Sequence, residues 1–218
     1  MHRSIKLLAL SAGIVLSSYA QAHAAAILDP ANDFVATYSA AAPKAGDLDV
    51  IRAEVTLNND VFVLFAELNG AVNTTPEASY VWGFNRGQGT ARFAAINQPN
   101  ILFDSVVVIQ NEGTGVVNDL VGGVPAGVLG AGSTTVLGNT ITTIVPISML
   151  ASRGFSPAAF TWNLWPRFGG VAGTGAISDF APSDGNANVT PVPEPATMLL
   201  LGTGLIGIAR RRSRKPQA

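Results

Sequence analysis

The side chains behind most enzyme mechanisms are missing from the greater part of this sequence. The 218 residues include no cysteine, and the two histidines, His2 and His23, both stand near the N-terminus. The chain therefore has no thiol nucleophile, disulfide or thiolate metal site. Beyond position 23 it cannot build a serine–histidine–aspartate triad or an imidazole metal site. What remains is the chemistry of carboxylates, either as paired acids in a glycosidase or as oxygen ligands for a hard cation.

Four aspartates gather near the start of the body, at Asp29, Asp33, Asp47 and Asp49. Their spacing places carboxylates on loops at one end of a sheet, where oxygen ligands can converge on calcium. The alternative is that Asp29 and Asp33 cap turns and that Asp47 and Asp49 flank the start of a strand. Neither the EF-hand pattern nor a glycine–aspartate repeat occurs. A structural calcium ion is the one cofactor that this sequence suggests.

The aromatic residues allow two interpretations. Trp82 shares a strand face with Tyr80 and Phe84, and Trp162 and Trp165 follow later in the chain. Such residues fill the interiors of β-sandwiches. Exposed on a surface, Trp82, Trp162 and Trp165 would instead form a glycan-binding face.

The glycine-rich segment 86–92 carries Arg86 and Arg92. We expect a tight turn between two strands, with these arginines paired to acids such as Asp104 or Asp179. A phosphate-binding loop would be followed by a helix and a Lys-Ser or Lys-Thr pair, and neither is present.

The elements that must position these side chains are strands. Ile51 to Leu57 alternates apolar with polar residues, a turn follows, and the apolar run Val61 to Leu68 returns as a central strand. Further strands are expected at 80–85, 102–110, 134–137, 140–145 and 161–164. The sequence thus predicts an all-β fold, an antiparallel β-sandwich of about seven or more strands. The glycine-rich stretch 121–133 is expected to be a loop.

Charge limits the partners of this body. The chain has 13 Lys and Arg against 14 Asp and Glu, but seven cations lie at its two ends and one acid, Glu194, lies near the C-terminus. Six cations and 13 acids remain, a net charge of −7. Nucleic acid is therefore not an expected partner, because phosphate contacts require clustered cations.

The N-terminus has the pattern of a secretory signal peptide. Arg3 and Lys6 precede an apolar run at 7–16, and small residues at 22–24 form a cleavage site. A retained membrane helix is the alternative, but polar residues interrupt the run short of the roughly 20 apolar residues required. We expect residues 1–24 to be removed, leaving a domain at 25–189. A second acceptable cleavage site at 20–22 would instead place the mature N-terminus at His23. Cleavage after position 24 also removes both histidines.

The C-terminus, residues 190–218, combines three features. Pro193, Glu194 and Pro195 are followed by an apolar stretch at 196–209 and then by Arg210, Arg211 and Arg212. A 14-residue helix is roughly 21 Å long, short of the roughly 30 Å hydrocarbon core. The arginines act as a basic stop-transfer signal on the cytoplasmic side. We expect a short membrane-associated helix rather than a final buried helix.

These three features resemble the PEP-CTERM sorting signal of Gram-negative bacteria. The resemblance covers residues 191–214 and implies that an exosortase recognises Pro193, Glu194 and Pro195 during export. It also implies a Gram-negative source and an association with exopolysaccharide or biofilm matrix. The Asp-rich opening of the body resembles DOMON-like and glucodextranase C-terminal β-sandwich modules, in which such acids hold a structural calcium ion.

Taken together, these features predict a non-catalytic protein of the cell surface or extracellular matrix, sorted by an exosortase through a membrane-bound precursor. One alternative is a carbohydrate-binding module for the cell's own exopolysaccharide. Another is a glycosidase that uses a carboxylate pair drawn from Glu54, Glu67 and Asp104. We expect no enzyme activity, because these three acids are more simply read as solvent-facing residues or arginine partners.

Overall fold

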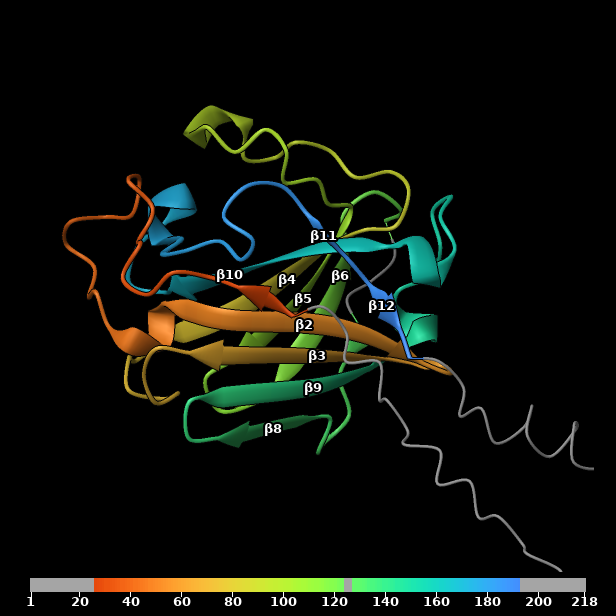
Figure 1. Cartoon of the computed structure of the whole chain (residues 1–218), viewed down its shortest axis with the longest axis horizontal. Helices are drawn as coiled ribbons and strands as arrows, with labels where there is room; N and C mark the ends of the chain where they lie inside the picture. Colours follow the sequence, from red (N-terminus) through yellow and green to blue (C-terminus); the bar gives the residue numbers. More distant parts are fainter. Residues whose placement is uncertain (1–25, 124–126, 193–218) are drawn as a thin grey trace, which may run out of the picture.

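The computed structural model describes residues 26–123 and 127–192 as two antiparallel sheets packed face to face (Figure 1). The first sheet has the order β1 (Ile27–Leu28), β2 (Val50–Asn58), β3 (Val61–Leu68), β9 (Thr140–Pro146) and β8 (Thr134–Leu137). β12 (Thr190–Pro191) adds to β2 as the one parallel pair. The second sheet has the order β11 (Ala187–Asn188), β10 (Thr161–Phe168), β4 (Ala78–Asn85), β5 (Ser105–Gln110), β6 (Gly115–Asp119) and β7 (Gly127–Val128). The predicted all-β sandwich is confirmed.

The connections contain only short 3₁₀ turns. These are η1 (Gly46–Leu48), η2 (Ala94–Ile96), η3 (Ile147–Met149), η4 (Pro157–Ala159) and η5 (Gly173–Ala176). Within residues 26–123 and 127–192, no helix is long and apolar enough to cross a membrane. The predicted signal peptide, the Pro193-Glu194-Pro195 segment, the apolar helix and the basic tail lie outside the described residues. β12 and the hydrogen bond from Val192 N to Leu57 O extend the sheet beyond the predicted domain end at 189.

The expected hairpin forms between β2 and β3, and β3 lies between β2 and β9 as predicted for an apolar strand. The predicted alternation in β2 is displaced at its start. A bulge between Val50 and Arg52 shifts the register, so Val50 is fully buried while Ile51 is only half-buried. An extra residue in one strand turns the following side chains to the other face.

The main core lies between the two sheets and contains six aromatic side chains, Phe62, Tyr80, Trp82, Phe84, Phe160 and Trp162. Tyr80, Trp82 and Phe84 all point inward from β4 and are 0% exposed. A second apolar cluster lies on the outer face of the second sheet, beneath the connection from β4 to β5. Its buried members are Val81, Phe93, Ile101, Phe103, Trp165, Ile177 and Phe180.

The predicted tight turn after β4 is wrong, because residues 86–104 form a long connection that contains η2. Gly87 adopts a φ of 125°, and a Cβ there would lie 2.8 Å from the carbonyl oxygen of Arg153. This close approach turns the chain away from the sheet. The connection then covers the second apolar cluster before β5 begins.

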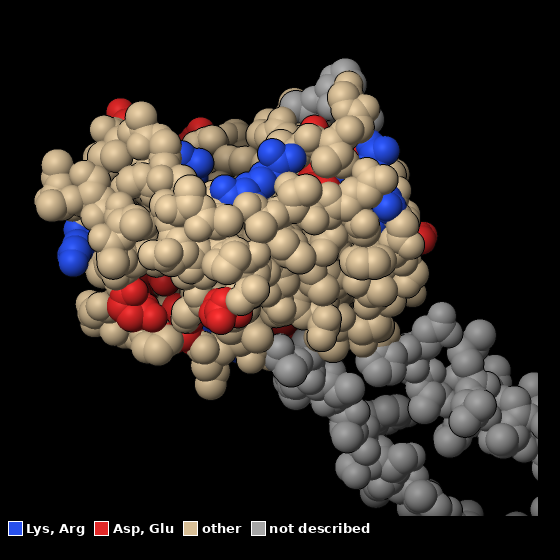
Figure 2. Space-filling view, turned by 90° about the horizontal axis from the view of Figure 1, so that it is seen from above, with Lys and Arg blue, Asp and Glu red and all other residues tan. Residues whose placement is uncertain are grey.

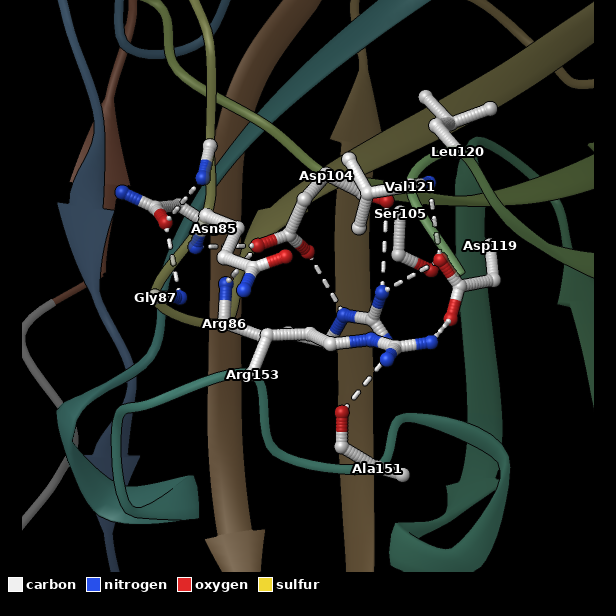
Figure 3. Close-up of polar contacts among 12 residues, drawn as sticks. Asn85, Arg86, Gly87, Asp104, Ser105, Asp119, Leu120, Val121, Ala151 and Arg153 are labelled. Carbon is white, nitrogen blue, oxygen red and sulfur yellow. Dashed lines mark hydrogen bonds and ion pairs between the residues drawn. The ribbon is translucent and has the colours of Figure 1, made fainter. Parts of the chain in front are cut away.

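Arg86 fixes both ends of this connection. Its side chain is 1% exposed, and Nε donates to Asp104 Oδ1 at 2.7 Å while the Arg86 backbone N–H donates to Asp104 Oδ2 at 2.9 Å (Figure 3). Nη1 donates to the Ala151 carbonyl at 3.0 Å, and Nη2 lies 3.1 Å from Asp119 Oδ1. Arg153 pairs with the other oxygen of Asp119. The predicted partnership of Arg86 with Asp104 is thus confirmed, whereas Asp179 lies elsewhere.

The network favours the ionised form of the Asp119 carboxyl. Burial alone would raise its pKa, but the hydrogen bond from Arg153, two backbone N–H donors and the charge of Arg86 hold the pKa well below the usual range. The carboxylate therefore stays ionised at any physiological pH.

Removing one member of the buried pair should be costly. We expect Asp104→Ala to reduce the free energy of unfolding by about 3–5 kcal/mol, because buried Arg86 would lose its closest carboxylate and retain only Asp119, which it shares with Arg153. For a domain of this size that corresponds to a fall in melting temperature of about 10 °C. Thermal unfolding of the exported protein measures it.

The control is the more exposed pair of Arg52 and Glu54, whose atoms lie 3.3 Å apart. Glu54→Ala should change the free energy of unfolding by less than about 1 kcal/mol. Equal effects of the two substitutions would show that the Arg86 network contributes no more than a surface ion pair.

Candidate metal centre

Asp29 follows β1 directly and is buried although it carries a carboxylate. Its backbone N–H donates to the carbonyl of Ile51 at 3.2 Å, which extends the pairing of β1 with β2. Oδ1 accepts a hydrogen bond from Ser183 Oγ at 3.0 Å, and only 9% of the residue is exposed. Oδ2 is also buried, yet it has no hydrogen-bond partner. A buried carboxylate oxygen without a partner is costly unless a cation or a proton compensates it.

Asp179 reaches the same place from the segment that follows η5. Its Oδ2 accepts the backbone N–H of Val50 at 2.9 Å, and Oδ1 accepts its neighbour Phe180 N–H at 2.7 Å. The side chain is 1% exposed. It therefore ties the start of β2 to a segment 129 residues later.

Asp33 completes a group of three carboxylates. One oxygen from each of Asp29, Asp33 and Asp179 lies within 4.8 Å of the others, and Asp33 is the exposed member. Asp33, Asp179 and Ser183 also line a cavity of about 350 Å³. Two buried acids and one exposed acid thus meet beside an opening through which a cation could enter.

The acids raise one another's pKa. Burial raises the pKa of Asp29 to about 7, with further contributions from the charges of Asp33 and Asp49. Burial and the charges of Asp29 and Asp33 likewise raise the pKa of Asp179 to about 8, against the effect of its backbone donors. The pKa of Asp33 is also raised, chiefly by burial. Near neutral pH the group must therefore hold protons or a cation.

The chemistry of the group fits calcium. Carboxylate and hydroxyl oxygens are the hard ligands that Ca²⁺ prefers, and six to eight are usual, with water completing the shell. Within the described part of the chain, no Lys or Arg forms an ion pair with Asp29, Asp33 or Asp179. A divalent cation held by these three acids would compensate the charge that no side chain compensates.

Two of the four predicted ligands stand outside this group. The prediction of Asp47 as a metal ligand is wrong, because its carboxylate caps the turn at 74–75. It accepts the N–H groups of Thr74 and Thr75 and the Thr75 hydroxyl, at 3.1, 2.7 and 2.6 Å. Asp47 lies in η1, just before β2 begins at Val50, as the alternative of acids flanking a strand start predicts.

Asp49 lies next to the group without being one of its three members. Its Oδ2 accepts the Asn32 N–H and the Asn69 Nδ2, each at 2.8 Å, and so holds the loop of Asp33 in place. Its Oδ1 is buried without a partner. Asp49 positions the loop and adds to the negative potential at Asp29 and Asp33.

The structure corrects the predicted glycan-binding face. Trp82 and Trp162 lie in the main core and are 0% and 1% exposed, so neither ring can stack on a sugar. Trp162 Nε1 donates to the Asn188 carbonyl at 3.1 Å, which anchors it further. Trp165 points the other way, into the second apolar cluster, and lines a different cavity.

One member of the group, Asp179, was not in the predicted set. Sequence reasoning named it instead, with Asp104, as a possible partner of Arg86 or Arg92. The signal that could have found it is the pair of strongly apolar flanks, Ile177 and Phe180, which indicate a buried position for an acid.

The similarity of this chain to a known protein family lies in its C-terminal residues. Residues 191–215 match the family described as the PEP-CTERM protein-sorting motif. This chain carries a PEP-CTERM sorting motif. No curated protein and no solved structure matches the chain.

The matched residues include every predicted element of the signal. Pro193, Glu194, Pro195, Arg210, Arg211 and Arg212 all lie within 191–215. The motif identifies the chain as an exported, surface-directed substrate of an exosortase. The resemblance of its body to DOMON-like and glucodextranase C-terminal modules stays a prediction.

The cation site makes a prediction about Asp29→Asn. An amide of the same shape keeps the acceptor for Ser183 and can donate to Asp179, but removes one negative charge. In the unchanged protein, millimolar calcium should raise the melting temperature by several degrees, since a hundredfold excess over Kd adds about 2.7 kcal/mol. In the Asp29→Asn variant the increase should disappear, while stability in chelator at pH 8 stays equal or rises.

The matched control is Asp60→Asn, at an exposed acid outside the group. It should retain the full calcium response. A calcium response that survives in Asp29→Asn, or that is absent from the unchanged protein, would contradict a cation site here.

The raised pKa values predict how stability changes with pH. In the unfolded chain these carboxyls ionise near pH 4, whereas Asp29 and Asp179 keep protons to about pH 7 and about pH 8 in the folded protein. Between these limits the folded state binds more protons, so stability falls as pH rises. Denaturant unfolding in chelator should show this decline from pH 5 to pH 8.5.

Saturating calcium should flatten the decline, because the ion replaces the protons. The Asp29→Asn variant should also show a flatter profile. Stability in chelator that is constant or increases over this pH range would mean that folding does not raise the pKa of these two carboxyls.

Proposed function

We propose that this protein is a non-catalytic component of the Gram-negative cell surface or extracellular matrix, with a β-sandwich body stabilised by a divalent cation. The observation that carries this proposal is the sorting motif at 191–215, which directs the chain to exosortase processing. The membrane-associated precursor and the matrix destination belong to the proposal. The acid group supports a structural role for the cation, because its members bind backbone groups at the ends of strands.

The three acids considered for a glycosidase have other roles. Asp104 is 0% exposed and bonded to Arg86, so a substrate cannot reach it. Glu54 pairs with Arg52, and Glu67 accepts a weak hydrogen bond from Asn139 at 3.5 Å. These contacts favour the solvent-facing and ion-pair roles.

The Asp29–Asp179 pair offers poor support for glycosidase chemistry as well. One oxygen of Asp29 lies within 4.8 Å of one oxygen of Asp179, and both residues are buried. Glycosidase carboxyls stand about 5 Å or more apart, because the glycosidic oxygen or a water must fit between them. Two buried acids this close together suit a proton or a cation better than a sugar.

Replacement of Pro193, Glu194 and Pro195 by alanine tests the sorting route. Translocation should proceed, and the variant should remain in the membrane fraction through its apolar C-terminal stretch. Mass spectrometry of the unmodified released protein should find an N-terminus at His23 or Ala25.

Pro216→Ala is the matched control, because Pro216 lies beyond the matched residues 191–215. Its release should be normal. Equal release of the triple-alanine variant would argue against exosortase recognition, and a released form that retains Met1 would argue against the signal peptide.

A further inference from the structure

The outer face of the second sheet carries a cavity that is separate from the acid group. It has a volume of about 400 Å³ and lies over β4, β5 and β10. Its lining residues are Ser79, Val81, Arg92, Phe93, Phe103, Val106, Val108, Trp165 and Arg167. A volume of this size suits a ligand of one or two small rings.

Four of the sheet residues that line the cavity are apolar, Val81, Val106, Val108 and Trp165. Val106 and Val108 are half-buried residues of β5, and Trp165 of β10 packs against Phe93 with ring centroids 5.0 Å apart. The Trp165 ring lies against Gly83, where a Cβ would come within 2.4 Å of Cη2. The shape of this surface therefore depends on a glycine that lets the indole lie on the sheet.

Two arginines give this apolar surface a positive charge. Arg92 is exposed, and its guanidinium lies 5.8 Å from the ring centroid of Phe103. Arg167 is half-buried, and its Nη2 donates to the Gly173 carbonyl at 3.0 Å. Burial lowers the pKa of Arg167 from its very high ordinary value, and the side chain remains a cation.

Neither arginine has an acidic partner within the described residues. Each makes a single protein hydrogen bond, from Arg92 to the Leu120 carbonyl at 3.4 Å and from Arg167 to Gly173, although a guanidinium has five N–H donors. In a body of net charge −7, two of the six cations thus meet at one cavity without acids. Figure 2 shows the largest groups of acids at the lower left of the face viewed there and several positive side chains along its upper part, with smaller acidic areas among them.

The charge and the apolar surface of this cavity indicate the chemical class of its ligand. Guanidinium groups bind carboxylates through paired, charge-assisted hydrogen bonds. An apolar and aromatic floor favours an organic ring over a bare phosphate or sulfate. A sugar ring that carries a carboxylate has both properties, a face of C–H groups and one negative charge.

We propose that Arg92 and Arg167 form the binding site for a uronate unit of an acidic polysaccharide, on the outer face of the second sheet. This inference rests on the proposed surface or matrix role and names the chemistry of what the domain would hold there. It keeps only Trp165 from the aromatic set. That residue is 2% exposed, so it supports the floor of the site from beneath and does not itself stack on the sugar.

Calorimetric titration of the exported protein with oligogalacturonate tests the proposal. The buffer contains a chelator, so that calcium held by the acid group cannot bridge protein and polymer. Arg92→Gln and Arg167→Gln should each weaken binding about tenfold or more, since a hydrogen bond to a charged group contributes about 1.5–3 kcal/mol. Binding should also weaken with rising salt.

Arg52→Gln is the matched control, because Arg52 lies on the other sheet and its partner is Glu54. It should bind like the unchanged protein, and melting curves of all variants should confirm folding. The methyl ester of the oligomer, which lacks the charge, should bind at least tenfold more weakly.

The remaining outcomes separate the sources of the carboxylate. Monomeric galacturonate that binds as tightly as the oligomer would overturn the polysaccharide in favour of a small organic acid. Absence of binding, equal binding of the methyl ester, or binding unaffected by the double arginine variant would overturn the site. None of these results touches the sorting route, which fails only if the triple-alanine variant is released normally.

Discussion

Every carboxylate that the fold buries must be compensated, and this body has few cations with which to do so. Six Lys and Arg stand against 13 Asp and Glu. Arg86 and Arg153 together serve Asp104 and Asp119, and within the described residues no Lys or Arg forms an ion pair with Asp29 or Asp179. Buried charge without a partner is among the most costly features of a protein interior. At Asp29 and Asp179, the stability of the fold therefore depends on protons or cations taken up from solution.

The buried acids use three different forms of compensation. Asp104 uses a guanidinium, and Asp47 uses the N–H and hydroxyl groups of a turn. Asp29 and Asp179 have donors from Ser183, Val50 and Phe180, but Asp29 Oδ2 has no partner, and we expect a proton or a cation to compensate it. The last form is the only one that responds to conditions outside the protein. An exported domain meets calcium at concentrations that suit weak extracellular sites, with Kd values of about 10⁻⁴–10⁻³ M.

Local patterns in the sequence predicted what local physics determines. Alternation and an apolar run were enough for the β2–β3 hairpin, and the order of prolines, apolar residues and arginines was enough for the sorting motif. The bulge at Val50 was beyond this reasoning, because alternation carries no information on a contact such as that of the Val50 N–H with Asp179, 129 residues away. The same distance hid Asp179 from the predicted metal ligands. Alternation also placed Trp82 with Tyr80 and Phe84 but could not tell which face is buried, since both a core and a binding face are aromatic.

Proton release on cation binding tests the central claim most directly. Two carboxyls with pKa values of about 7 and about 8 must lose protons when a divalent cation binds them. Addition of calcium to the chelator-treated, desalted protein in a pH-stat at pH 7 should release protons in a saturable manner. The release should shrink by pH 9, where the carboxyls are already ionised, and should be lost in Asp29→Asn. Calcium that binds without proton release at pH 7, or that does not bind at all, would contradict a cation held by Asp29, Asp33 and Asp179.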